Sequence, residues 1–101
     1  MASFAQMLKQ AQKLQKDMEV AQAEIATIQV EGAAGGGVVK VILTGDKKVV
    51  DITIAPEVMD DVEMLQDLLK IAMNEAVEKA TEISESRMGG LTNGMSVPGL
   101  F

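Results

Sequence analysis

The sequence contains no cysteine, no histidine, no tryptophan and no tyrosine, and each absence excludes a class of function. Without cysteine there is no disulfide, no thiol nucleophile and no thiolate ligand for zinc or an iron–sulfur cluster. Without histidine there is no histidine-based triad and none of the usual zinc or haem ligation. No apolar run reaches the roughly 18 residues of a membrane span, and the N-terminus lacks the pattern of a signal peptide. We therefore expect a cytoplasmic protein that is not an enzyme and uses no cofactor, metal, membrane or small-molecule substrate.

The length and composition predict one small domain with an aliphatic core. The chain has 101 residues, of which 48% are hydrophobic, with two Phe and eight Met. A chain of this size buries roughly 60–65% of the surface that its unfolded form exposes. Fifteen acidic residues against nine basic residues give a net charge of −6, which by itself argues against nucleic acid as a partner.

The first third of the chain has the period of an amphipathic helix. Ser3 is a candidate N-cap, with Gln6 in the position that completes a capping box. Apolar residues then follow at alternating steps of three and four, which is an a/d heptad pattern: Phe4, Met7, Ala11, Leu14, Met18, Ala21, Ile25 and Ile28. The pattern predicts a helix over residues 3–27.

The expected length of this helix suggests that part of it projects. Twenty-five residues at 1.5 Å each give about 38 Å, whereas a compact domain of 100 residues has a radius of gyration of about 13 Å. We therefore expect the helix to extend beyond the domain and another chain to cover its free apolar positions.

The middle of the chain reads as three strands. Ile28 and Val30 alternate with polar residues, residues 38–44 are rich in β-branched side chains, and Val50, Ile52 and Ile54 alternate with Asp51 and Thr53. The glycine-rich stretch after Gly32, residues 33–37, is expected to form a loop, and Gly45-Asp46 a turn. Short connections predict an antiparallel meander within a two-layer α+β domain.

A second helix is expected over residues 61–88. Asp60 or Asp61 can cap it, and an apolar stripe runs along it through Leu65, Leu69 and Ala72. Gly89-Gly90 is expected to end it. The sequence therefore predicts one domain over residues 1–88 and a flexible, uncharged tail over residues 89–101.

Two features invite a chemical interpretation, and structural interpretations are favoured for both. The glycine-rich stretch lacks the Gly-Lys-Ser/Thr of a phosphate-binding loop and lies between two strands, which is typical of a hairpin loop. Asp60, Asp61 and Glu63 have the spacing of a helix N-terminus, where the helix dipole favours acidic side chains.

The distribution of charge is more informative than its sum. Residues 1–16 carry three lysines and no acid, whereas residues 57–86 carry nine acids and two lysines. Lys9, Lys13 and Lys16 all lie opposite the heptad seam, among glutamines. Lys47 and Lys48 lie at the expected hairpin tip. Solubilising lysines on an amphipathic helix remain the simpler interpretation of this pattern alone.

An ordered set of segments resembles the YbaB/EbfC family of bacterial nucleoid-associated proteins. The segments are Met7 to Gln15, the glycine-rich loop running into Val38 to Val41, Val50 to Pro56, Asp67 to Leu69, Ala72 to Ala76, Gly94-Met95 and Pro98-Gly99. The resemblance covers nearly the whole chain and implies an α-β-β-β-α fold with projecting helices, assembled as an intertwined homodimer.

The resemblance also implies a function and its residues. Members bind double-stranded DNA, often with little sequence preference, and some influence gene expression; the expected site of action is the nucleoid, in the cytoplasm. The candidate DNA-binding residues are Lys9, Lys13, Lys16, Lys47 and Lys48. The candidate dimer contacts are Met7, Ala11, Leu14, Met18, Leu65, Leu69 and Met73. A homodimeric protein-interaction module without DNA binding remains the alternative, favoured by the net charge of −6 and the acidic second helix.

Overall fold

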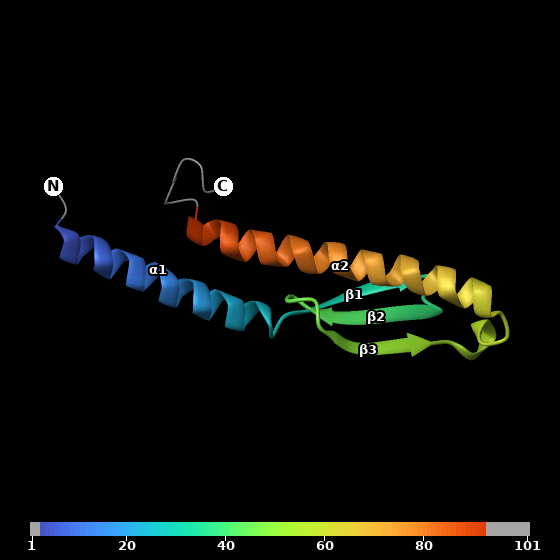
Figure 1. Cartoon of the computed structure of the whole chain (residues 1–101). Helices are drawn as coiled ribbons and strands as arrows, with labels where there is room; N and C mark the ends of the chain where they lie inside the picture. Colours follow the sequence, from blue (N-terminus) through green and yellow to red (C-terminus); the bar gives the residue numbers. More distant parts are fainter. Residues whose placement is uncertain (1–2, 93–101) are drawn as a thin grey trace.

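The computed structural model describes residues 3–92, which form two long helices and a three-stranded sheet (Figure 1). The elements in chain order are α1 (Phe4–Ile25), β1 (Gln29–Ala34), β2 (Val39–Thr44), β3 (Val49–Ile54), a short 3-10 helix η1 (Pro56–Val58) and α2 (Val62–Thr92). This order confirms the predicted α+β class and its α-β-β-β-α arrangement. The 3-10 helix, which begins at Pro56, was not predicted.

Both helices begin where the sequence places a cap. The Ser3 hydroxyl accepts a hydrogen bond from the backbone N–H of Gln6, and the Gln6 side chain accepts one from the N–H of Ser3, which is a complete capping box. At the start of α2, the Asp61 carboxylate accepts a hydrogen bond from the N–H of Met64 at 3.0 Å. Of the two candidate caps, Asp61 is therefore the one that the structure uses.

The sheet is antiparallel with β2 in the centre, as the short connections predicted. The first strand is longer than expected, because it continues through Gly32, and Ala33 and Ala34 pair with Lys40 and Val39 rather than forming a loop. The prediction was wrong because a run of small residues is typical of a loop, whereas here small residues let the strand pack closely against α2. The loop itself is the tight turn at Gly35, Gly36 and Gly37, all with positive φ, which confirms the expected hairpin.

The core lies between α2 and one face of β1 and β2. Val39, Val41 and Leu43 of β2 are fully buried, and they meet the small side chains of Ala72 and Ala76 on α2. The helix approaches most closely at Gly32, where there is no side chain to hold it away. The opposite face of the sheet carries exposed polar residues such as Lys40 and Asp51, as expected for a two-layer domain.

The molecule is long and narrow, measuring 69 × 24 × 16 Å with a radius of gyration of 19.4 Å. A compact domain of this length would have a radius of about 13 Å. The difference arises because α1 packs against α2 only through its C-terminal half, where Ala21 and Ile25 are buried. The N-terminal half of α1 extends past the end of α2 (Figure 1), which confirms the predicted projection.

The second helix ends later than expected. It continues through Gly89 and Gly90 to Thr92, so the boundary predicted at residue 89 falls inside α2. Two glycines disfavour a helix by only about 1 kcal/mol each, and neither of them has a positive φ that would end it. The rest of the predicted tail, residues 93–101, lies outside the described residues.

Candidate nucleic-acid interface

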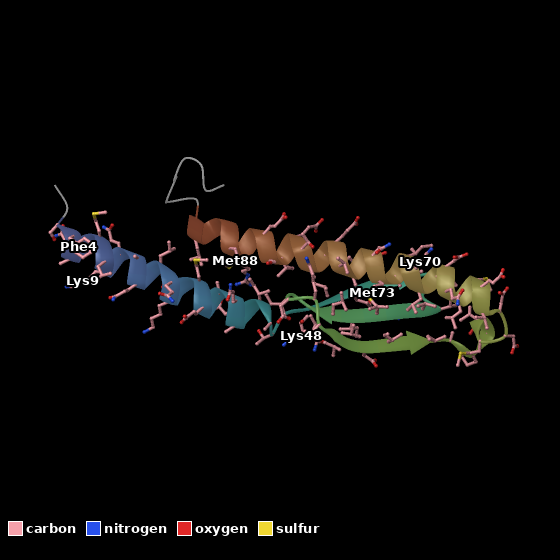
Figure 2. The ribbon with its side chains drawn as sticks, in the orientation of Figure 1. Phe4, Lys9, Lys48, Lys70, Met73 and Met88 are labelled. Atoms are coloured by element: carbon pink, nitrogen blue, oxygen red, sulfur yellow. The ribbon has the colours of Figure 1, made fainter. Side chains whose placement is uncertain are left out.

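The projecting half of α1 carries a stripe of three lysines. Lys9, Lys13 and Lys16 are separated by four and three residues, which places them on one side of the helix. All three side chains are exposed, and no ion pair holds them within residues 3–92. We call residues 4–16 of α1 the arm; Figure 2 labels Lys9 near its outer end.

The arm is separated from the acidic part of the molecule. It contains no Asp or Glu, and the first acid along α1 is Asp17. Lys9 lies about 12 Å beyond Asp17 along the helix axis, which exceeds the screening length of about 8 Å at physiological ionic strength. The outer part of the arm therefore presents positive charge to solvent although the whole chain is negative.

The structure does not bring Lys47 and Lys48 to the arm. They lie in the hairpin between β2 and β3, which is held at the other end of α1 by a hydrogen bond from the N–H of Gly45 to the carbonyl of Ile28. Figure 2 shows Lys48 near the C-terminal end of α1 and Lys9 at the far end. The five predicted DNA-binding residues thus form two separate groups.

The hairpin is ordered by Thr44. Its hydroxyl accepts a hydrogen bond from the N–H of Lys48 at 3.0 Å and donates one to the carboxylate of Asp46. Lys47 has φ of 68°, a left-handed conformation that is uncommon for a residue with a side chain. Both lysines are exposed, but the adjacent Asp46 offsets part of their charge.

The acidic residues outside the arm form no binding site. Within the described residues, no group of three acidic side chains is arranged to hold a metal ion. Asp61 caps α2, and Glu75 pairs with Lys79 at 3.1 Å on the surface of the same helix. None of the helices that the structure describes is long and apolar enough to cross a membrane.

The predicted dimer contacts also divide into two groups. Met7 and Ala11 are exposed on the arm, and Leu14 and Met18 are half-buried where α2 ends. Leu65, Leu69 and Met73 are half-buried along α2, packed against the edge of the core. Leu69 and Met73 line a shallow groove on the side of α2.

An apolar surface on β3 was missed by the sequence interpretation. Ile52 pairs with Val41 and Ile54 with Val39, so these residues lie on the same face of the sheet as α2. Yet Val50 is 46% exposed and Ile52 is 41% exposed, because α2 lies over β1 and β2. The alternation of apolar and polar residues along β3 predicted that its apolar face is buried. It does not indicate whether the same chain or a second chain buries that face.

The offset of α2 leaves apolar residues of β3 uncovered. Lys79 of α2 donates a hydrogen bond to the carbonyl of Glu31 on β1 at 2.8 Å, so that side of the helix is fixed over β1. Val50 and Ile52 of β3 stay exposed, and we call these two residues the β3 surface.

Comparison with known proteins gives consistent matches over nearly the whole chain. A nucleoid-associated protein of Alkaliphilus metalliredigens is 53% identical over 97 residues, covering 94% of this chain and 85% of its own length. One from Pelotomaculum thermopropionicum is 46% identical over 101 residues, covering 98% of this chain and 96% of its own length.

The fold is shared with a solved structure. The crystal structure of the uncharacterized protein HP0035 from Helicobacter pylori matches with a TM-score of 0.80 and 22% sequence identity, covering 95% of this chain and all of the other. The YbaB/EbfC DNA-binding family matches residues 1–95, and it is a family of DNA-binding proteins rather than of enzymes. The chain belongs to the YbaB/EbfC DNA-binding family, as the resemblance in its sequence predicted.

Proposed function

We propose that the protein is a nucleoid-associated protein that binds double-stranded DNA as a homodimer in the cytoplasm, mainly through phosphate contacts. The observation that carries the proposal is the arm, a projecting segment without an acid on which Lys9, Lys13 and Lys16 are all exposed. The names of the relatives and of the family support a role at the nucleoid.

The chemistry of the arm favours contact with the DNA backbone. Lysine ammonium groups neutralise phosphates and release counterions, which favours binding without reading sequence. Base recognition commonly uses arginine in the major groove or aromatic stacking on exposed bases. The chain has a single arginine, Arg87, which is ion-paired with Glu24 at 3.6 Å, and neither Tyr nor Trp. We therefore expect weak, salt-sensitive and nearly non-specific binding, with any effect on gene expression following from occupancy of many sites.

A second copy of the chain is the partner that we propose for the β3 surface. Val50 and Ile52 are exposed there, and exposed apolar surface of this kind marks an interaction site. A two-fold axis would place the same surface of both copies against each other. The dimer would then carry two arms with six arm lysines, which doubles the positive charge available to one DNA duplex.

A DNA titration across salt concentrations tests the proposal. The logarithm of the association constant should fall linearly with the logarithm of the salt concentration. Replacing Lys9, Lys13 and Lys16 by Gln should reduce the steepness of that line by up to about 5 in the dimer, since each phosphate contact contributes about 0.9. Unchanged affinity in the triple variant would remove the arm from the interface.

A matched pair of charge reversals separates a local contact from net charge. Lys13→Glu and Lys40→Glu change the charge of the protein equally, but Lys40 lies on β2, on the exposed face of the sheet. The arm variant should weaken binding strongly, and the strand variant only slightly. Equal losses would mean that overall charge, rather than the arm, governs binding.

A protein-interaction module is the second candidate, and the net charge of −6 favours it. In that case the same dimer would hold a protein partner through apolar surface, and DNA would not bind even at about 50 mM salt, where non-specific DNA binding is strong. The salt titration therefore distinguishes the two candidates.

A further inference from the structure

The base of α1 rests on the hairpin between β2 and β3. Ile25, the last residue of α1, is 3% exposed and lies directly against the backbone of Gly45. A Cβ atom at Gly45 would lie 2.6 Å from the carbonyl oxygen of Ile25 and 2.7 Å from its Cγ2 atom. Side-chain atoms do not approach other atoms that closely, so this contact exists only because residue 45 has no side chain.

Space, rather than backbone conformation, is what requires glycine at this position. Among the described glycines, positive φ occurs at Gly35, Gly36 and Gly37, and Gly45 is not one of them. Its backbone therefore does not need the conformational freedom of glycine, and the contact with Ile25 is what opposes a side chain. The sequence pattern assigned Gly45 to a turn and gave no sign of this contact.

The surrounding groups hold the base of α1 in place. The N–H of Gly45 donates a hydrogen bond to the carbonyl of Ile28 at 2.8 Å, and the N–H of Ile28 donates one to the carbonyl of Ile25 at 3.2 Å. Asp46 of the hairpin and Ser84 of α2 line one cleft with Ile25. The end of α1 is thus enclosed between the hairpin and α2.

A second support of α1 lies about one turn closer to the arm. Ala21 is 8% exposed and packs against α2, four residues before Ile25. Arg87 of α2 pairs with Glu24 at 3.6 Å between these two supports, but both side chains are about half exposed and such pairs contribute little. The direction of the arm is therefore set by Ala21 and Ile25, which lie about 6 Å apart along the helix axis.

We propose that Gly45 is a positioning residue for the arm: the bare backbone of the hairpin sets the place of Ile25, and through it the direction in which the arm lysines project. A side chain at residue 45 moves Ile25 by about 0.8 Å, because ordinary contact begins at 3.4 Å. With Ala21 as the pivot, α1 rotates by about 8° and its outer end at Phe4 moves by about 3 Å. The consequence for DNA rests on the proposed function, whereas the direction of the arm does not.

Residual dipolar couplings of the backbone amides measure the angle between α1 and β2 in the intact protein. Gly45→Ala should rotate α1 by about 8° relative to β2, while the angle between α2 and β2 stays the same. Gly36→Ala is the control, because its φ of 74° makes alanine unfavourable although nothing lies within 4 Å of the added atom. An unchanged angle in Gly45→Ala, or an equal rotation in the control, would overturn the proposal.

A second variant tests the same contact from the side of α1 and leaves the hairpin glycine in place. Ile25→Ala removes the side chain that lies against Gly45, so the base of α1 loses part of its support. The couplings of the α1 amides should then fall relative to those of β2, because the direction of the helix fluctuates. Couplings of the parent size throughout α1 would show that the contact does not set the direction of the arm.

A DNA titration connects the direction of the arm to binding. Gly45→Ala retains every lysine, yet it should weaken binding by about three- to tenfold at 100 mM salt, since displaced groups meet the phosphates less well. Gly36→Ala should bind as the parent does. A rotated arm with unchanged affinity would overturn the positioning role. If the parent itself binds no DNA, the proposed function fails, and the couplings still decide whether Gly45 sets the direction of the arm.

Discussion

Gly32 of β1 lies directly beneath the backbone of α2 at Ala72 and Ala76. A Cβ atom at Gly32 would lie 2.6 Å from the backbone nitrogen of Ala76 and closer still to the carbonyl oxygen of Ala72. The helix therefore rests on the backbone of the first strand. This close approach fixes α2 over β1 and β2, and it is the reason that β3 remains uncovered in one chain.

Gly32→Ala should destabilise the protein strongly. The added methyl group meets backbone rather than a movable side chain, so α2 must shift away from the sheet; overpacking of this kind costs about 1–3 kcal/mol. Thermal or urea unfolding of the variant measures the cost. A variant as stable as the parent would show that α2 is held less closely than the structure indicates.

The two helices and the residues at which they begin were predictable because their causes are local. The heptad spacing of α1, the capping box at Ser3 and the cap at Asp61 depend on residues within a few positions of one another. The strand at Ala33 and Ala34 was missed because its identity depends on α2, which is distant in sequence. The late end of α2 was missed because glycine lowers the stability of a helix without requiring it to stop.

The candidate site was predictable only in part for the same reason. The spacing of Lys9, Lys13 and Lys16 places them on one side of a helix, whatever the rest of the chain does. Their separation from Lys48 depends on the position of the hairpin relative to α1, which the sequence does not state. The exposed surface at Ile52 depends on where α2 crosses the sheet, and that is set at Gly32.

Ile52→Glu should dissociate the proposed dimer. The substitution places a charge on the β3 surface, where burial in a dimer without a partner for the charge is costly. Thr53→Glu is the matched control, because the neighbouring residue on β3 points to the opposite, polar face. Light scattering at micromolar concentration should give a monomer for the first variant and a dimer for the second. If both variants behave alike, the β3 surface is not the interface.

Replacing the hairpin lysines should weaken DNA binding less than replacing those of the arm. Lys47→Asn with Lys48→Gln removes two charges and keeps the left-handed conformation of residue 47 accessible, since Asn tolerates positive φ. The hairpin charges lie beside Asp46 and away from the arm, so we expect a loss of less than about tenfold at 100 mM salt. Fluorescence anisotropy with a short duplex measures it. A loss as large as that of the arm variant would place the hairpin at the centre of the interface.

Gly90→Ala should stabilise the C-terminal end of α2. Gly90 is helical, a Cβ atom there meets nothing within 4 Å, and alanine is favoured over glycine in a helix by about 0.8–1 kcal/mol. The gain should appear as slower hydrogen exchange in the last turns of α2, with a smaller rise in the melting temperature because helix ends open locally. Gly36→Ala is the contrasting variant: its site is equally open, but its φ of 74° makes alanine unfavourable. Stabilisation by Gly36→Ala would contradict the positive φ of Gly36, and destabilisation by Gly90→Ala would contradict the helical conformation of Gly90.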